Sequence, residues 1–451
     1  MAEWSPSSWT QKPIKQDVIY EDLQGLKDSL QKLQKLPPLV TTQEINNLKK
    51  SLRNVALGKA FVLQGGDCAE LFDYCSQEMI EAKVKLLLQM SLVLIWGANK
   101  PVIRIARIAG QFAKSHQWSG NALFPRRQHQ WLPSRHQIPP TRPITSSLSL
   151  LPLRGNSELS PCLPLLRPGR PALPLDWGLG HVITPSIKEQ YTKIVGAVKD
   201  ALRFMHTVGI DKDRGFETAD IFTSHEGLSL EYEQSLTRLL RHPAYPGSTA
   251  APETGYYATS GHFIWIGDRT RQLGGAHVEF FRGIANPVGI KIGPSMKPDE
   301  LVQLLDVVNP DREIGKVTLI SRYGAAKIAD FLPGHIAAVQ ASGHIPVWQC
   351  DPMHGNTQST PSGVKTRHFT DILSELKQAL EIHRAAGSFL GGMHLELTGE
   401  AVTECVGGAA GLTEEGLGER YTTFCDPRLN EKQALELAFL VAGFYREESE
   451  E

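Results

Sequence analysis

A histidine in a short turn is the first candidate for chemistry in this chain. Residues 350–357 read CDPMHGNT, in which His354 follows a short apolar run and a turn opens around it. We interpret this segment as a metal-ligand loop at the end of a strand, because neutral imidazole is the commonest ligand of borderline metals. A solvated or hydrogen-bonded histidine is the alternative. Further ligands must decide between the two, and the sequence offers Cys68, His394, Glu396 and Asp426.

The types of these side chains indicate which metals such a site would hold. One thiolate, one imidazole and two carboxylates suit Mn, Fe, Co or Zn better than Mg or Ca, which prefer shells of oxygen alone. His394 is two residues from Glu396 and points to the same strand face, so it could orient a ligand without binding the metal. Glu396 and Asp426 could alternatively be structural carboxylates that pair with arginines.

Basic side chains recur at the ends of separate β-prone runs, at Arg107, Arg269, Lys291 and Arg322. Cations gathered at one place repel each other unless they bind anions, and planar guanidinium groups suit phosphate and carboxylate. We therefore expect a small, polyanionic phosphorylated acid as the ligand. Taken singly, each cation could also be a surface charge or an ion-pair partner. Lys291 could be a Schiff-base lysine, although neighbouring arginines and a metal favour anion binding.

Two reactions fit a metal beside a basic cluster. In the first, the metal acts as a Lewis acid and polarises a carbonyl that a carbon nucleophile attacks. In the second, a metal-bound water hydrolyses the substrate.

The elements that must position these residues alternate between strands and helices. We expect eight strands, namely FVLQ at 61, PVIRI at 101, DIFT at 220, HFIW at 262, PVGIK at 287, VTLI at 317, IPVWQ at 345 and GMHLE at 392. Helical stretches lie between them at residues 76–96, 230–241, 298–308, 324–332, 335–342 and 371–386. This alternation predicts an α/β fold with parallel strands, closed into a (β/α)8 barrel, with catalytic groups at the carboxyl ends of the strands.

Two segments depart from this alternation. Residues 1–57 read as a polar lead-in followed by two helices, at about 20–34 and, with Thr42 as N-cap, at about 42–53. Residues 115–175 hold eleven prolines, seven arginines and a single acid, Glu158. Prolines at that density prevent ordinary helices and central strands. The sequence thus predicts an N-terminal helical extension and a catalytic barrel over residues 58–446, interrupted by an irregular proline-rich insert.

Composition argues against several classes of binding partner and several cellular locations. With 451 residues and a formal net charge of -1, the chain has no overall attraction to nucleic acid or anionic membranes. No apolar run approaches the roughly 18 residues of a membrane span. The six cysteines are dispersed without CxxC spacing, which argues against a disulfide scaffold and a zinc ribbon. The N-terminus has neither signal-peptide nor transit-peptide features, so we expect a cytoplasmic protein.

Several long motifs resemble those of one family. They include FVLQGGDCAE, KPVIRIARIAGQFAK, FTSHEGL, WIGDRTRQLGGAHVEFFRGIANPVGIKIGPSM, LISRYGAAKIADFLP, WQCDPMHGNT, GVKTRHF, HLELTGEAVTECVGG and CDPRLN. Together they resemble the class II 3-deoxy-D-arabino-heptulosonate 7-phosphate (DAHP) synthases, over residues 1–114 and 176–446. The specificity of WIGDRTRQL and DPMHGNT disfavours another metal-dependent lyase on the same barrel.

The resemblance implies a fold, a reaction and an assembly. The family has a TIM barrel with an N-terminal extension and is typically homo-oligomeric. It condenses phosphoenolpyruvate with erythrose 4-phosphate and releases phosphate, in the first step of the shikimate pathway to chorismate and the aromatic amino acids. This transferase reaction requires a divalent metal, for which we expect Mn or Co, with Fe or Zn as alternatives.

The resemblance also assigns roles to individual residues. It makes Cys68, His354, Glu396 and Asp426 the metal ligands. It places phosphoenolpyruvate against Arg107, Asp268, Arg269, Lys291 and Arg322, of which Arg107, Arg269 and Lys291 would be catalytic. It turns Lys114 toward the aldose phosphate.

The proline-rich insert is where the chain departs from the family. After GQFAK the family continues with a Pro-Arg-Ser motif, a Pro-Ser-x-Arg-Gly-Asp stretch and a helical region, which residues 115–175 replace. This loss removes part of the aldose-phosphate site. The alternative to an active enzyme is therefore a catalytically impaired or regulatory homologue, or a faulty gene model.

Overall fold

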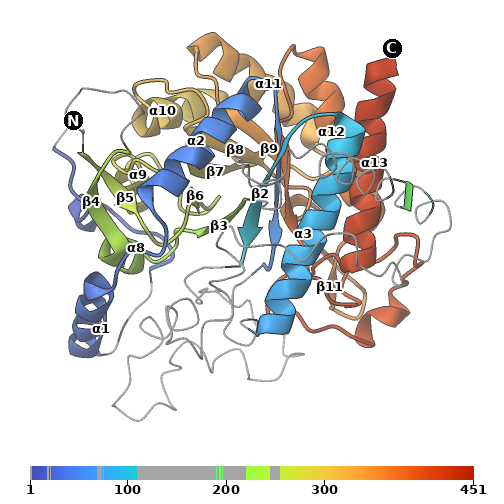
Figure 1. The fold of residues 1–451 in the computed structure, drawn as a ribbon, viewed down its shortest axis with the longest axis horizontal. Helices are drawn as coiled ribbons and strands as arrows, with labels where there is room; N and C mark the ends of the chain where they lie inside the picture. The colour runs from blue at the N-terminus through green and yellow to red at the C-terminus, as the bar shows by residue number, and fades with distance from the viewer. Residues whose placement is uncertain are drawn as a thin grey trace, which may run out of the picture.

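A closed barrel of eight parallel strands forms the centre of the computed structural model (Figure 1). The structure describes residues 3–17, 20, 22–68, 74, 76–108, 189, 192, 193, 196, 220–243 and 254–450, without the side chains of 447–450. Around the barrel the strands follow the order β1-β12-β9-β8-β7-β6-β3-β2. Their bounds are β1 Phe61–Gly66, β2 Val102–Arg107, β3 Ile221–Glu226, β6 Phe263–Ile266, β7 Val288–Ile292, β8 Val317–Ser321, β9 Val347–Cys350 and β12 Gly392–Glu396. Every predicted strand is present, and the predicted (β/α)8 fold is confirmed.

Helices surround the barrel, and most of them match the predicted stretches. They are α3 Gln77–Ala98, α8 Leu230–Leu236, α9 Ala276–Phe281, α10 Pro298–Val308, α11 Ile328–Ser342, α12 Phe369–Ala385 and α13 Glu431–Glu450. Helices α3 and α13 lie side by side on one flank of the barrel (Figure 1). Gly97 permits this approach, because a Cβ there would lie 2.3 Å from the Cβ of Ala442. Helices α9 and α13 were not predicted.

One predicted pair of helices is a single helix in the structure. Helix α11 runs through Pro333 without a break, whereas the sequence predicted separate helices over 324–332 and 335–342. A proline inside a helix costs about 3 kcal/mol through a lost hydrogen bond and a clash. Ile328, Leu332, Ile336 and Val339 are buried along one face of α11, and this burial on both sides of Pro333 outweighs the cost.

The predicted helix over residues 230–241 is wrong in its second half. Helix α8 ends at Leu236, and Thr237–Arg241 forms strand β4, which pairs antiparallel with β5, Thr254–Ala258. The chain leaves the helix because β5 supplies hydrogen-bond partners to the backbone of β4. Strand β5 lies outside residues 230–241, so the periodicity of that segment alone could not indicate the pairing.

The N-terminal extension holds two helices, and the second closes one end of the barrel. These are α1 Leu23–Lys35 and α2 Thr42–Ala56. Leu48, Leu52 and Val55 of α2 join a buried cluster with inward-facing barrel residues near the amino ends of the strands, such as Val62 and Val347. The closed amino end leaves the carboxyl ends of the strands for the functional side chains.

The beginning of α2 differs by one residue from the prediction. Thr41, and not Thr42, is the N-cap, and it forms a capping box with Glu44. The Glu44 amide donates to the Thr41 hydroxyl at 3.3 Å, and the Thr41 amide donates to the Glu44 carboxylate at 2.8 Å. Two adjacent threonines cannot be told apart as caps from sequence alone, because either can place its hydroxyl near the first turn.

Part of the chain remains outside this description. Lys114 and the predicted insert at 115–175 lie outside the described residues. Among the residues that are described, no helix is long and apolar enough to cross a membrane.

Candidate active site

The structure brings most of the predicted site residues to the carboxyl end of the barrel. Arg107 and Glu396 are the last residues of β2 and β12, and Lys291 lies one residue before the end of β7. The other described members follow strands, with Cys68 after β1, Asp268 and Arg269 after β6, Arg322 after β8 and His354 after β9. Asp426 reaches the same region from the chain before α13.

The four predicted metal ligands form one compact group. Cys68, His354, Glu396 and Asp426 each offer a ligand atom, and these atoms all lie within 4.8 Å of one another. The Cys68 sulfur lies 3.6 Å from Asp426 Oδ2, and His354 Nε2 lies 3.1 Å from Glu396 Oε1. A thiolate, an imidazole and two carboxylates at this spacing fit a divalent transition metal.

Asp351 orients the histidine of this group, and the sequence analysis did not single it out. His354 Nδ1 lies 2.7 Å from Asp351 Oδ2, while the amides of Met353 and His354 donate to Asp351 Oδ1 at 3.0 and 3.2 Å. This bond assigns a proton to Nδ1 and turns Nε2 toward the other ligands, as carboxylates behind ligating histidines do at metal centres.

The charges around His354 favour a cation between these ligands. Although burial opposes the charged imidazole, Asp351 and Glu396 raise the pKa of His354 to about 10. Burial likewise opposes the charged form of Glu396, but His354 and then Arg367 hold the pKa of that carboxyl well below its usual range. The ionised carboxylates thus retain a proton on the imidazole, and a bound metal would displace it.

Basic side chains line the site beside the ligand group. Arg107 is buried, and its guanidinium donates to Glu396 Oε1 at 3.2 Å and to the Cys68 carbonyl at 3.3 Å. Lys291 is buried and forms an ion pair with Asp351, the same carboxylate that holds His354. Burial and the nearby Arg107 lower the pKa of Lys291 to about 8, against the opposing effect of Asp351. Asp351 therefore links the predicted metal site to the predicted anion site.

Comparison with known proteins identifies the family. A sequence model of the class-II DAHP synthetase family matches residues 4–121 and 171–442. The chain belongs to this family. The unmatched residues between the two matches, 122–170, fall within the predicted insert.

Three relatives are similar in sequence to this chain over most of their length, and each is named a phospho-2-dehydro-3-deoxyheptonate aldolase. The protein from Neurospora crassa is 54% identical over 473 residues, covering 99% of this chain and 95% of the relative. The protein from Mycolicibacterium smegmatis is 43% identical, covering 92% of this chain and 89% of its own. The protein from Streptomyces coelicolor is 40% identical and covers 99% of both chains.

Asp268 connects the loops that follow β6 and β8. Its carboxylate accepts from Arg322 Nη1 at 2.7 Å and from Arg271 Nε at 3.0 Å. Arg322 also donates to the His354 carbonyl at 3.2 Å, so it connects both loops to the metal-ligand loop. Arg269 is exposed. Asp268 thus orients two arginines. The sequence analysis predicted a place for Asp268 in the phosphoenolpyruvate site and did not predict these ion pairs.

His394 lies beneath Arg107 and outside the compact ligand group. Its Nε2 is 3.1 Å from Arg107 Nη1, and its Nδ1 is 2.9 Å from Gln64 Oε1. Burial, then Lys291 and Arg107, hold the pKa of His394 well below its usual range, so the imidazole is neutral and can accept from the guanidinium. This geometry agrees with an orienting role for His394.

A buried ionic network that the sequence analysis missed holds the loops of Cys68 and Asp426. Arg428 donates to both oxygens of Glu404, at 2.8 Å from Nη2 and 3.0 Å from Nε, and its Nη1 lies 3.1 Å from Asp67 Oδ1. Lys83 of α3 forms a second ion pair with Asp67. Asp67 precedes Cys68 directly, and Arg428 follows Asp426 by two residues, so the network sets the positions of both predicted ligands.

Proposed function

We propose that this enzyme condenses phosphoenolpyruvate with D-erythrose 4-phosphate to give 3-deoxy-D-arabino-heptulosonate 7-phosphate and phosphate. It would thereby act as a 3-deoxy-7-phosphoheptulonate synthase, in the first step of the shikimate pathway. One observation carries the proposal, namely the compact group of Cys68, His354, Glu396 and Asp426 beside the buried cations Arg107 and Lys291. Similarity to three named aldolases along nearly the whole chain favours an active enzyme over a silent homologue.

The compact group would hold Mn or Co, with Fe or Zn as alternatives. When bound, such a metal supplies a Lewis acid that polarises the aldehyde of the aldose phosphate. The protein's part is to keep His354 Nε2 turned to the metal through Asp351, and to keep the carboxylates of Asp351 and Glu396 ionised.

The basic side chains would bind and orient phosphoenolpyruvate. Arg107 and Arg322 present guanidinium groups to its phosphate and carboxylate, and Arg269 adds a third cation at the exposed rim. Asp268 keeps Arg322 in place. Lys291, with a pKa of about 8, can hold a proton near the reacting carbons, and its ion pair with Asp351 fixes its position. These cations stabilise negative charge as the phosphate leaves.

Further features of the proposal rest on the sequence. Lys114 would contact the phosphate of erythrose 4-phosphate. Residues 1–57 would be an accessory extension on a catalytic barrel over 58–446, interrupted at 115–175. We also propose a cytoplasmic homo-oligomer that binds neither nucleic acid nor membranes.

Steady-state condensation by the purified full chain, with Mn or Co supplied, tests the proposal. A Cys68→Ser variant should lose metal-dependent product, while Cys162→Ser, which changes a thiol of the proline-rich segment, should retain it. Phosphate release from phosphoenolpyruvate alone distinguishes hydrolysis from condensation, since condensation requires the aldose phosphate. Absence of product from a folded chain that binds both metal and phosphoenolpyruvate would refute an active synthase.

A further inference from the structure

The first residues of the chain form an arm that packs beside one loop of the proposed active site. This N-terminal arm, residues 3–17, contains the 3-10 helix η1, Ser8–Gln11, which lies against α9. The loop between β6 and α9 carries Asp268 and Arg269, two residues of the predicted phosphoenolpyruvate site. The arm is therefore placed to act on that site, and the proposed function gives it no role.

Two tryptophans anchor the N-terminal arm. Trp9 is buried, and its indole Nε1 donates to Gln234 Oε1 at 2.9 Å. The Trp4 indole donates to the Glu279 carbonyl at 2.9 Å, and its ring lies against Gly283, where a Cβ would be only 2.0 Å away. These contacts join the arm to α8 and α9, so the residues that follow in the arm have defined positions.

The arm continues along the loop between β6 and α9. The Pro13 carbonyl accepts from the Ala276 amide at 3.0 Å, and Ile14 packs on the main hydrophobic cluster. Gln16 follows with a φ of 58°. Residues other than glycine rarely adopt this left-handed backbone conformation, and it persists where surrounding contacts hold it. Gln16 is thus held in an unfavourable conformation at the point where the arm passes the loop.

The side chain of Gln16 contacts Arg269. Its amide oxygen lies 3.2 Å from Nε and 2.9 Å from Nη1 of the guanidinium, and the oxygen must face Arg269 because the amide nitrogen would oppose two donors. Gln16 is partly buried, whereas Arg269 is exposed. A long exposed side chain loses rotamer freedom when it binds a ligand, and a partner that fixes it beforehand reduces that cost. Gln16 therefore preorganises Arg269.

The partner of Arg269 differs in charge from the partner of the neighbouring arginines. Arg271 and Arg322 both form ion pairs with Asp268. Within the described part of the chain no carboxylate pairs with Arg269, and its partner Gln16 is a neutral amide. A neutral acceptor orients a guanidinium without cancelling its charge, so Arg269 keeps its full positive charge for an anion.

We propose that Gln16 is a positioning residue of the phosphoenolpyruvate site, through which the N-terminal arm holds the Arg269 guanidinium ready for an anionic group of the substrate. This inference rests on the proposed function, because it requires that phosphoenolpyruvate binds at Arg269. It gives the arm a part in substrate binding, in addition to its packing on α8 and α9.

Calorimetric titration of the full chain with phosphoenolpyruvate, with Mn supplied, tests this inference. Steady-state condensation gives kcat and KM beside the Kd. Gln16→Ala removes the amide, and Gln16→Gly also removes it but permits the left-handed backbone without strain. Gln11→Ala makes the matching exchange at an exposed position of the same arm and serves as the control.

We expect both Gln16 variants to raise the Kd and the KM for phosphoenolpyruvate about fivefold, with kcat changed by less than about twofold. Gln11→Ala should leave all three constants unchanged. The inference is overturned if both Gln16 variants bind phosphoenolpyruvate like the parent chain, or if Gln11→Ala weakens binding as much as they do.

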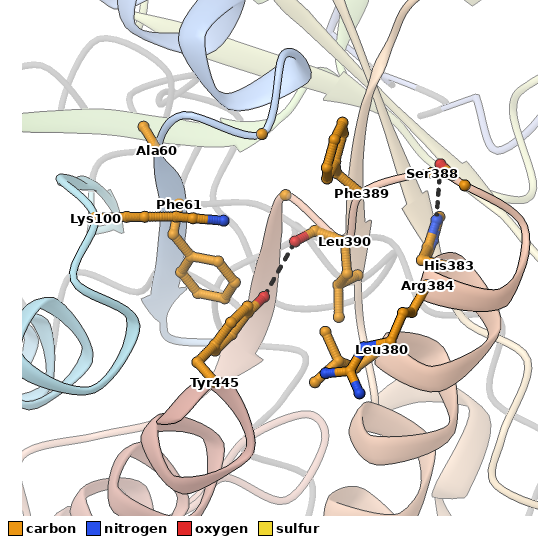
Figure 2. A pocket seen from close by; sticks show the side chains of 13 residues that line it. Ala60, Phe61, Lys100, Leu380, His383, Arg384, Ser388, Phe389, Leu390 and Tyr445 are labelled. Carbon is orange, nitrogen blue, oxygen red and sulfur yellow. Dashed lines mark hydrogen bonds between the residues drawn. The ribbon is translucent and has the colours of Figure 1, made fainter. Parts of the chain in front are cut away.

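Arg269→Ala shows whether Gln16 acts through Arg269. It should weaken phosphoenolpyruvate binding about tenfold. Lys100→Ala removes a positive charge beside Tyr445, before the amino end of β2, and should leave the Kd unchanged (Figure 2). Gln16→Ala should have no further effect in the Arg269→Ala chain, because residues that act through one contact are not additive. The same fivefold effect in both backgrounds would overturn the inference.

Binding and turnover separate this inference from the proposed function. A parent chain that binds phosphoenolpyruvate but forms no product refutes the proposed condensation alone, because the comparison of Kd values needs no turnover. A parent chain that does not bind phosphoenolpyruvate refutes both.

Discussion

Asp351 is the residue at which the two halves of the proposed active site meet. Its carboxylate holds His354 Nδ1 at 2.7 Å and forms the ion pair with Lys291. We expect Asp351→Asn to weaken metal binding by about 10- to 100-fold, because carboxylates behind a ligating histidine contribute on that scale. Competition with a chromogenic chelator measures this affinity directly, without any turnover.

A matched variant separates this effect from a general loss of charge. Asp306→Asn removes a carboxylate that pairs with His344 at 2.9 Å and is 53% exposed, away from the ligand group. It should leave the metal affinity unchanged. If Asp351→Asn bound metal as tightly as the parent while Cys68→Ser did not, Asp351 would have no part in orienting His354.

At the scale of single residues, the sequence predicts the functional side chains at strand ends well. It predicts less well the residues that hold those side chains in position. Arg107, Lys291 and His354 were found because each closes or follows a strand of a recognisable barrel. Asp351 lies in the same motif as His354 but carries no signal of its own. Asp67 and Arg428 are 361 positions apart, so their buried contact depends on how the barrel closes and cannot be read from spacing.

At the scale of elements, Glu375 of α12 joins two loops of the site. Its Oε1 accepts from the amides of Tyr323 and Gly324 at 2.9 Å, and its Oε2 accepts from Asn356 Nδ2 at 2.8 Å. Tyr323 and Gly324 follow Arg322, and Asn356 lies in the loop of His354. One buried carboxylate thus fixes the loops that carry a proposed phosphoenolpyruvate ligand and a proposed metal ligand.

We expect Glu375→Ala to destabilise the fold by about 2–6 kcal/mol, because two buried amides lose their acceptor at about 1–3 kcal/mol each. The Michaelis constant for phosphoenolpyruvate should rise as Arg322 loses its support. Denaturant unfolding and steady-state kinetics measure the two effects. Glu381→Ala, on the exposed face of the same helix, should change stability by less than about 0.5 kcal/mol. Equal effects of the two variants would contradict the role of Glu375.

The capping box of α2 makes a contribution to the stability of the fold that depends on pH. The neighbouring His262 imidazole and the Thr41 groups lower the pKa of Glu44 to about 2, although burial opposes them. Because the folded pKa lies below the ordinary value of 4.5, this stabilisation is present above pH 4.5 and is lost as the pH falls toward 2. Glu44→Ala should therefore cost about 1 kcal/mol at neutral pH and progressively less in acid.

The neighbouring exposed residue provides the control for this prediction. Gln43→Ala changes a side chain that bonds Asn47 on the helix surface at 2.9 Å and does not titrate. Its effect on the free energy of unfolding should be small and independent of pH. A Glu44→Ala effect that stayed constant between neutral and acid pH would show that the carboxylate is not needed in its charged form.

Most elements of this fold could be predicted because their signals are local. The barrel strands are short apolar runs, and α10 begins and ends where its pattern predicted. The failures involve information from elsewhere in the chain. Strand β4 exists because β5 pairs with it, and α11 continues through Pro333 because its buried face packs on both sides of the proline.

At the scale of the whole molecule, the N-terminal extension is a structural part of the barrel. Leu48, Leu52 and Val55 of α2 belong to the same buried cluster as the inward-facing residues of the strands. Without α2, the amino end of the barrel would expose this cluster to water. The extension therefore contributes to the stability of the fold that carries the proposed active site at the opposite end.

Leu52→Ala tests this dependence across the molecule. Leu52 is fully buried, and truncating a buried leucine costs about 2–5 kcal/mol through lost burial and a residual cavity. Asn47→Ala, on the exposed face of α2, should change stability by less than about 0.5 kcal/mol. Because α2 packs at the end of the barrel away from the predicted metal ligands, folded Leu52→Ala should keep its affinity for metal. A loss of metal affinity without a loss of stability would instead mean that α2 acts on the site directly.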